Sequence, residues 1–290
     1  MPELPELEVI REVLERRVVG EEIAEVQVLP PGGPIVTRDL TGSGFGTLTG
    51  RSLLSVRRRG KFLIFEFPGE PLLYLAINPK LAGRLQLAGP GDKRAARTRI
   101  VFLLKNGRQL RYLDPKQMGQ LYLTDWLERL PEFSKLGPEA TEIAWDDFRQ
   151  RIKPFRGEIK GVLRRGEFVA GIGNAYADEI LWTAKLNPFR KRTQLTAEEL
   201  ERLYAGMRST LLDAIVKVRD VMGENIETEP RQFMAVHMKT GEPCPRCGTP
   251  ISLIGANEWN TNFCRTCQPG GLLKGISEHQ QKKSESDTDG

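Results

Sequence analysis

The sequence predicts an α+β protein, in which a strand-rich amino-terminal part precedes a helical part and a small cysteine module. Short β-rich runs, separated by turn residues, follow one another up to about residue 123. Apolar residues then recur at helical spacing between about residues 145 and 218, and two Cys-x2-Cys pairs come after them. Short strands with turns are typical of an antiparallel sandwich or a barrel, and the pattern alone leaves both open.

The amino-terminal part is expected to begin with a helix over residues 5–19. Pro5 suits a first helical position and Gly20 suits a helix end. One face of this helix is apolar, with Ile10, Val13, Leu14 and Val18. Strands are expected after it, at residues 24–28, 61–67, 72–77, 100–104 and 109–113. Asn106-Gly107, between the last two strands, predicts a hairpin with a type I′ turn.

The sequence pattern changes near residue 130, where the first domain is expected to end. Helices are predicted for residues 145–152, 174–185 and 196–218. The predicted divisions are an amino-terminal domain, a linker, a helical domain, a finger and a polar disordered tail, at residues 1–130, 131–144, 145–232, 233–270 and 275–290.

Composition excludes several classes of protein. No run of eighteen apolar residues occurs, and five glutamates among the first fifteen residues are unlike a secretory signal, so we expect a cytoplasmic protein. Only two histidines are present, which argues against Ser-His-Asp catalysis and His-rich metal sites. Forty-three basic residues against 38 acidic ones give a net charge of +5, which suits a polyanionic partner and equally a solvated basic surface.

Four cysteines give the strongest local signal. Sixteen residues separate Cys244-x2-Cys247 from Cys264-x2-Cys267, a spacing typical of a zinc ribbon. Four thiolates complete a tetrahedral site, so we expect one structural zinc ion with no open position for a substrate. A redox pair or two disulfides are the alternatives. Such ribbons bind nucleic acid, protein or neither, so the module alone does not specify a function.

A candidate phosphate site precedes the second predicted helix. Gly171 and Gly173 come just before it and Asn174 is its expected N-cap residue, where exposed N–H groups and the helix dipole favour an anion. Lys160 lies upstream and adds positive charge. An ordinary helix start has the same pattern.

The amino terminus is a candidate for covalent chemistry. If Met1 is removed, Pro2 presents a secondary amine. An α-amino group has a pKa of about 7.7–8.0, against about 10.4 for lysine, so far more of it is a free base at neutral pH. Such an amine can form an iminium ion with a sugar C1′, with Glu3 moving protons. A helix-leading Pro-Glu segment with no chemical role is the alternative.

Four motifs in this order resemble one family. They are Pro2-Glu-Leu-Pro-Glu6-x-Glu8, Arg59-Gly-Lys61-Phe, Val169-Ala-Gly-Ile-Gly-Asn174-x-Tyr-Ala-Asp-Glu, and Pro243-Cys-Pro-Arg-Cys-Gly with Phe263-Cys-x-x-Cys-Gln268. The chain resembles the formamidopyrimidine-DNA glycosylase/endonuclease VIII family from residue 1 to about residue 270. The resemblance implies an amino-terminal antiparallel β-sandwich with flanking helices, a helix-two-turn-helix domain and a zinc finger. It also implies that DNA lies between two lobes, with the damaged base flipped into a pocket.

The resemblance further implies roles for individual residues. Pro2 would be the Schiff-base nucleophile and Glu3 its acid/base, while Glu6 would help to order the site. Lys61 would be the general acid for strand elimination and a phosphate contact. Asn174 and Lys160 would hold phosphates flanking the lesion, and Lys116, Leu81 and Met118 would also contact the DNA.

Several of these positions depart from the family pattern. Leu81 stands where the family has a wedge methionine, and Met118 replaces an aromatic residue that stacks opposite the lesion. Lys116 replaces an arginine, which keeps the cation and loses bidentate bonding. Trp259-Asn260-Thr261 replaces Arg-Gly-Thr at the finger tip, so δ-elimination stays open. The changed wedge leaves the preferred lesion and the opposite base open.

We therefore expect a bifunctional DNA glycosylase and AP lyase of base-excision repair. It would remove oxidised bases through a Schiff base on Pro2, followed by β-elimination. Its expected partner is double-stranded DNA containing damaged bases or abasic sites, and it would act as a monomer at the nucleoid, away from membranes. The alternative is a zinc protein of the same fold that binds damaged or structured DNA without cleaving it.

Overall fold

The computed structural model describes residues 1–255 and 260–270, which form two compact units. Unit 1 comprises residues 1–143, 165–172 and 211–233. Unit 2 comprises residues 144–164, 173–210 and the described residues from 234 onward. The units are interleaved along the chain, whereas the predicted domains are continuous, because the long helix α6 contributes to both units. The predicted tail at 275–290 lies outside the described residues.

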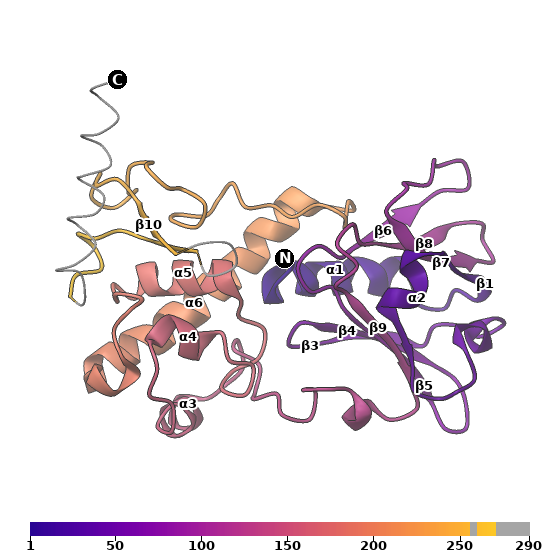
Figure 1. The fold of residues 1–290 in the computed structure, drawn as a ribbon, viewed down its shortest axis with the longest axis horizontal. Coiled ribbons are helices and arrows are strands. Elements are labelled where there is room, and N and C mark those ends of the chain that lie inside the picture. Colours follow the sequence, from indigo (N-terminus) through magenta and orange to yellow (C-terminus); the bar gives the residue numbers. More distant parts are fainter. Residues whose placement is uncertain (256–259, 271–290) are drawn as a thin grey trace. The chain divides into compact units, whose positions relative to one another are not determined.

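Unit 1 contains two separate β-sheets, which favours the sandwich over the barrel (Figure 1). One sheet has the strand order β1-β7-β8-β6 and the other has the order β2-β9-β5-β4-β3. The strands are β1 Ile23–Val28, β2 Thr37–Asp39, β3 Ser55–Arg59, β4 Phe62–Phe67, β5 Leu73–Asn78, β6 Arg84–Ala88, β7 Thr98–Leu104, β8 Gln109–Leu113 and β9 Gln120–Thr124. Neighbouring strands are antiparallel, as expected, except that the short edge strand β2 pairs in parallel with β9.

Helix α1, Leu4–Val18, confirms the predicted first helix to within one residue. Glu3 is its N-cap and Pro5 lies in its first turn, where the missing N–H group costs nothing. Arg16 and Arg17 lie in the last turn of the helix, where positive charge interacts favourably with the negative end of the helix dipole. The short helices of unit 1 are α2 Gly32–Val36, η1 Phe45–Leu48 and η2 Leu127–Arg129.

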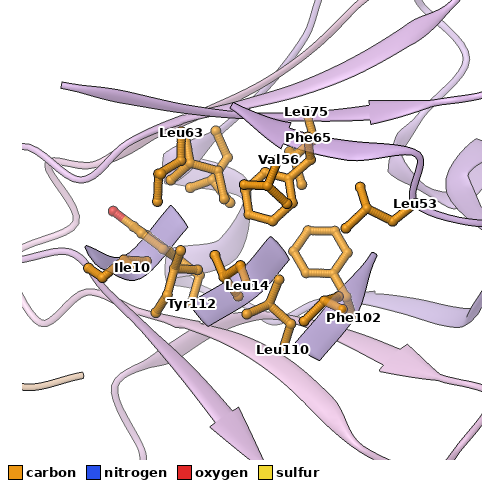
Figure 2. Packing of buried hydrophobic residues seen from close by; sticks show 14 of the residues in the cluster. Ile10, Leu14, Leu53, Val56, Leu63, Phe65, Leu75, Phe102, Leu110 and Tyr112 are labelled. Carbon is orange, nitrogen blue, oxygen red and sulfur yellow. The ribbon is translucent and has the colours of Figure 1, made fainter. Parts of the chain in front are cut away.

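The core of unit 1 lies between the two sheets and includes the apolar face of α1. Figure 2 shows Leu14 between Phe65 on β4 and Phe102 on β7, with Tyr112 on β8 nearby. These side chains are 0–1% exposed, and each contributes about 1.5–3 kcal/mol to stability by leaving water. The core therefore holds α1 in place, and with it the segment that carries Pro2.

The hairpin between β7 and β8 forms where Asn106-Gly107 predicts it, although with another turn type. Gly107 has a φ of +83°, whereas Asn106 has a negative φ, so the type I′ prediction is wrong. Leu104 donates its backbone N–H to the Arg108 carbonyl, and its own carbonyl accepts the N–H of Gly107, around a three-residue loop. Such a loop needs only one left-handed residue, at its last position, and Gly107 occupies that position.

Unit 2 contains the predicted helices and the cysteine hairpin (Figure 1). Its elements are α3 Trp145–Arg151, α4 Ile159–Leu163, α5 Asn174–Thr183, η3 Arg192–Gln194, the first half of α6 (Ala197–Met222), and the paired strands β10 Ser252–Ile254 and β11 Thr261–Phe263. Helix α4 was not predicted, because its five residues are too few to show a helical period. Within the described part of the chain, we find no helix that is both long enough and apolar enough to cross a bilayer.

Candidate functional site

The four cysteines form one compact cluster, as their spacing predicts. Their Sγ atoms all lie within 4.8 Å of one another, with Cys247 and Cys264 at 3.4 Å and Cys244 and Cys267 at 3.9 Å. A tetrahedral zinc ion with Zn–S bonds of about 2.3 Å separates its sulfur ligands by about 3.8 Å. None of the cysteines in the described chain forms a disulfide. The donor set therefore fits one structural zinc ion held by four thiolates.

Hydrogen bonds already favour some of the thiolates. Trp182 donates its indole N–H to Cys244 Sγ, and the backbone N–H of Cys267 donates to Cys264 Sγ, both at 3.4 Å. Hydrogen bonds with Thr249 lower the pKa of Cys247 to about 6. Burial and the neighbouring thiols raise the pKa of Cys267 to about 12. A bound zinc ion would supply the positive charge that ionises all four groups.

The amino terminus of unit 1 is buried. Glu3 is 1% exposed, Pro2 is buried beside it, and the backbone N–H of Glu3 donates to Glu6 Oε2 at 2.9 Å. The backbone N–H of Leu4 donates to the carbonyl of Gly171 at 3.1 Å. Gly171 has a φ of +101°, and a Cβ there would lie 2.6 Å from the Leu4 side chain. The first glycine of the candidate phosphate motif thus makes room for the start of α1.

Charged groups surround this terminus. The Met1 ammonium group lies 2.6 Å from Glu229, which also forms an ion pair with Arg84. Arg231 donates to the Met1 carbonyl at 2.8 Å, pairs with Glu229 at 2.8 Å and lies 3.4 Å from Glu6. Two arginines and two carboxylates therefore enclose the first peptide bond of the chain.

This cluster shifts the protonation of both partners of the Met1–Glu229 pair. Burial lowers the pKa of the Met1 amine, and although Glu229 opposes this, Arg84 and Arg231 add to it. Burial alone would raise the pKa of Glu229, but the Met1 ammonium group and the two arginines outweigh it and lower that pKa to about 2. An amine at this place is thus favoured as a free base, which is the nucleophilic form.

Lys61 lies in the two-residue turn between β3 and β4 and is partly exposed. Gly60 precedes it with a φ of +56°, and its N–H donates to Glu139 Oε1 at 2.6 Å. Arg58 and Arg59 both form ion pairs with the same Glu139 carboxylate. Arg58 and Arg59 are therefore engaged within unit 1, whereas Lys61 lies in the turn itself and is partly exposed.

The predicted wedge and stacking residues lie on two loops of unit 1. Leu81 is half-buried in the loop between β5 and β6, and Lys116 and Met118 are exposed between β8 and β9. Asp114 orders the second loop, because its carboxylate accepts the N–H groups of Lys116, Gln117 and Gly119 at 3.1, 3.0 and 2.7 Å.

Tyr112 lies beneath both loops. A Cβ on Gly83 would lie 2.1 Å from the Tyr112 hydroxyl oxygen, and one on Gly119 would lie 1.6 Å from it. The hydroxyl group is buried, and the Asp114 carboxylate lies near it. Burial, with the nearby charge of Asp114, raises the pKa of Tyr112. One phenol therefore sets the spacing of the two loops.

In unit 2, Lys160 and Asn174 meet at the finger. Lys160 Nζ donates to the Asn260 carbonyl at 2.8 Å and to Thr261 Oγ1 at 2.9 Å, and it lies 2.6 Å from Asp178. Asn174 Nδ2 donates to the same Asn260 carbonyl at 2.9 Å. Their role as phosphate contacts stays a prediction, since the Lys160 ammonium group is buried and lies among protein oxygen atoms.

Two expectations for this region concern the start of α5 and the finger tip. Gly173 is the N-cap of α5 and Asn174 is its first helical residue, so the prediction that Asn174 caps the helix is wrong. The side chain of Asn174 reaches the finger backbone instead. Trp259 of the predicted finger tip lies outside the described residues.

Sequence analysis missed the charged partners of the amino terminus. Glu229 and Arg231 lie 228 and 230 positions from Met1, in a segment without periodicity, and Arg84 begins a strand that was not predicted. Asp178, which is 1% exposed, lies within the Asn174 motif, and a carboxylate inside a helix of small apolar residues was a signal for a buried ion pair.

Three domain families match the chain in order. The amino-terminal domain of formamidopyrimidine-DNA glycosylase matches residues 1–121, and its H2TH domain matches residues 136–224. The zinc finger found in FPG and IleRS matches residues 241–270.

Relatives of similar length resemble the whole chain. The formamidopyrimidine-DNA glycosylase of Pelotomaculum thermopropionicum is 35% identical, over 92% of this chain and 99% of that protein. The enzyme of the same name from Herpetosiphon aurantiacus is 33% identical, over 92% and 100%. Among solved structures, the Lactococcus lactis Fpg in complex with DNA containing an abasic site has a TM-score of 0.80 at 31% identity, over 92% and 100%. MutM (Fpg) from Thermus thermophilus has a TM-score of 0.80 at 32% identity, over 93% and 100%.

Proposed function

This chain belongs to the formamidopyrimidine-DNA glycosylase family, and from that premise we propose that it excises oxidised bases and then cuts the abasic strand through a Schiff base on Pro2. Base excision itself follows from the family. We propose the lyase step and the residues that perform it. We also propose that the protein acts at the nucleoid as a monomer. The observation that supports them most is the buried amino terminus, where Pro2 and Glu3 lie inside a cluster of four charged side chains.

In the proposed reaction, the free amine of Pro2 attacks C1′ of the damaged nucleotide. The bond from C1′ to the base breaks, and the base leaves with the electron pair and takes up a proton. Glu3 accepts the proton of the amine and returns it to O4′ as the sugar ring opens, which leaves an iminium ion. The cationic nitrogen acidifies C2′, so loss of that proton expels the 3′ phosphate. Water then hydrolyses the iminium ion and frees Pro2.

We assign supporting roles to Glu6 and Lys61. Glu6 accepts the backbone N–H of Glu3 and lies beside Arg231, so it orients the segment that carries the nucleophile. Lys61, at the tip of its turn, is suited to protonate the phosphate that leaves. Both assignments are consistent with the geometry, and mutation tests them separately from binding.

DNA contacts are proposed on both units. Exposed Lys116 suits a backbone phosphate, and Leu81 with Met118 suits the gap that a flipped base leaves. In unit 2, Asn174 and Lys160 hold the backbone that leads into β11, so we propose that they shape the phosphate contacts of the finger. Zinc stabilises the hairpin to which this backbone belongs.

Borohydride trapping tests the lyase proposal. Incubation with duplex DNA containing an abasic site should give a covalent complex, since borohydride reduces the iminium ion to a stable amine. Pro2→Gly should abolish most trapping while it leaves DNA affinity within about threefold of the parent, or about 0.7 kcal/mol. A protein that binds such DNA and is never trapped would be the non-cleaving alternative.

The substrate range is best tested with a panel of lesions. Solved complexes of the Lactococcus lactis protein contain abasic-site DNA and Fapy-dG DNA, so these are natural first substrates. Because Leu81 and Met118 differ from the family pattern, we propose that the opposite-base preference differs as well. Cleavage of each lesion opposite each of the four bases would measure it.

A further inference from the structure

The charged cluster at the amino terminus has members that the proposed reaction does not use. Arg231 Nη2 donates to the Met1 carbonyl at 2.8 Å, and this carbonyl shares a peptide bond with the Pro2 nitrogen. Bond lengths of about 1.2 Å and 1.3 Å place the guanidinium nitrogen within about 5.4 Å of the Pro2 nitrogen. Removal of Met1 takes away the carbonyl and leaves this cation beside the new terminal amine.

We propose that Arg231 is a positioning residue of the reaction, whose guanidinium group keeps the Pro2 nitrogen unprotonated against the opposing charge of Glu229. The proposal rests on the proposed function of Pro2. A like charge within about 4–6 Å disfavours the charged form of a group, whereas an opposite charge favours it. Arg231 and Glu229 should therefore act on the amine in opposite directions.

Arg231 is held rigidly enough for this role. Its side chain is 15% exposed and has ion pairs with Glu229 at 2.8 Å and Glu6 at 3.4 Å. Both carboxylates are themselves mostly buried, at 16% and 1% exposed. A cation fixed by two buried anions cannot swing into water when the terminus is shortened.

The other charged groups at the terminus enter the same balance. Arg84, on β6, pairs with Glu229 Oε2, whereas Arg231 pairs with Oε1, and Arg84 adds positive charge. Glu6 and Glu3, on α1, add negative charge, and Glu6 is already engaged by Arg231 and by a backbone N–H group. Burial acts in the same direction as the arginines, as the lowered pKa of the Met1 amine illustrates.

Direct titration of the nitrogen tests the proposal without any catalysis. The protein, with loss of Met1 verified by intact mass, would be labelled with ¹³C-proline, and Pro2 would be assigned by its absence in Pro2→Gly. Arg231→Gln should move the titration midpoint of Pro2 up by about one pH unit, and Glu229→Gln should move it down by about the same amount. Arg231→Lys should restore most of the parent value, because it keeps the charge.

The pH profile of borohydride trapping provides a second measurement. Its midpoint should follow the same two opposite shifts, whereas Arg17→Gln, an exposed control on α1, should leave it unchanged. If both variants of the cluster only lower the yield of trapping at an unmoved midpoint, Arg231 has a purely structural role and the proposal is overturned. If the nitrogen titrates as expected and nothing is trapped, the charge balance stands and the lyase proposal fails. Retention of Met1 in active protein would overturn both.

Discussion

The hydroxyl oxygen of Tyr112 lies 1.6 Å from the point that a Cβ atom on Gly119 would occupy. This contact joins the core of the sandwich to the loop that carries Lys116 and Met118. It leaves no room for a larger residue at position 119, because the phenol is fully buried and fixed by its ring.

Gly119→Ala should therefore destabilise the protein by about 1–3 kcal/mol, the usual cost of overpacking. Chemical denaturation would measure the change. Gly91→Ala is the matched control, since nothing lies within 4 Å of a Cβ at that position. Tyr112→Phe removes the oxygen and should recover part of the loss when combined with Gly119→Ala. A Gly119→Ala protein as stable as the parent would show that the Tyr112 side chain can move to relieve the contact.

Lys160 is expected to matter for stability. Lys160→Met leaves the Asp178 carboxylate, which is fully buried, without its closest cation, although His237 and the N–H of Asn262 remain at 2.8 and 3.2 Å. Removing one partner of a buried ion pair costs about 3–5 kcal/mol, so the melting temperature should fall by several degrees. Adding Asp178→Asn to Lys160→Met should restore part of the lost melting temperature. An unchanged melting temperature in Lys160→Met would argue against a structural role for the pair.

Lys116, unlike Lys160, is exposed on its loop, so we expect its replacement to affect DNA binding and not stability. Lys116→Ala should leave the melting temperature unchanged and should weaken binding to every duplex. The slope of log affinity against log salt concentration should fall by about 0.9, the value for one phosphate contact. Lys105→Ala, another exposed lysine of unit 1, serves as the control. A loss confined to damaged duplexes would instead assign Lys116 to recognition of the lesion.

Removal of zinc should unfold the finger. Its hairpin has only two strands of three residues each, which cannot form a stable core without the metal. We expect one zinc ion per chain by elemental analysis, and loss of that ion in Cys264→Ala together with a lower melting temperature. Thr266→Ala, beside the same cluster, should retain the metal. Metal-free protein that melts at the parent temperature would contradict this assignment.

The cluster around Glu229 predicts a dependence of stability on acid. In protein that retains Met1, the folded pKa of Glu229 is about 2, below the ordinary value of 4.5, so the ionised carboxylate stabilises the folded protein above about pH 4.5. That contribution is lost as the pH falls from about 4.5 towards 2. The denaturant concentration at half-unfolding should fall less steeply with decreasing pH for Glu229→Gln than for the parent. Parallel curves for the two proteins would contradict the shift.

Local patterns in the sequence predicted the elements that local physics determines. Helix α1 has its apolar face and end signals within fifteen residues, and the cysteine spacing carries the geometry of a zinc site. The type of the β7–β8 turn was mistaken, because the dipeptide Asn106-Gly107 also suits a longer loop with a single left-handed residue. Helix α4 and strand β2 are too short to show any period.

Contacts between distant residues could not be predicted in this way. The Met1–Glu229 ion pair joins residues 228 positions apart, and no property of either residue alone indicates the other. The same holds for Lys160 and Asn260, whose meeting depends on how α4 packs against the finger strand. Residue chemistry identified Pro2 as a candidate, whereas the charged groups around the amino terminus emerged only from the fold.

The buried amino terminus has a practical consequence for handling this protein. Any affinity tag or fusion partner attached ahead of Pro2 would keep its nitrogen in an amide bond, at a place where Arg231 and Glu229 already contact Met1. Material purified in that form should be inert even when it is well folded. Tags are therefore better placed elsewhere, or removed by a protease whose cut leaves proline as the first residue.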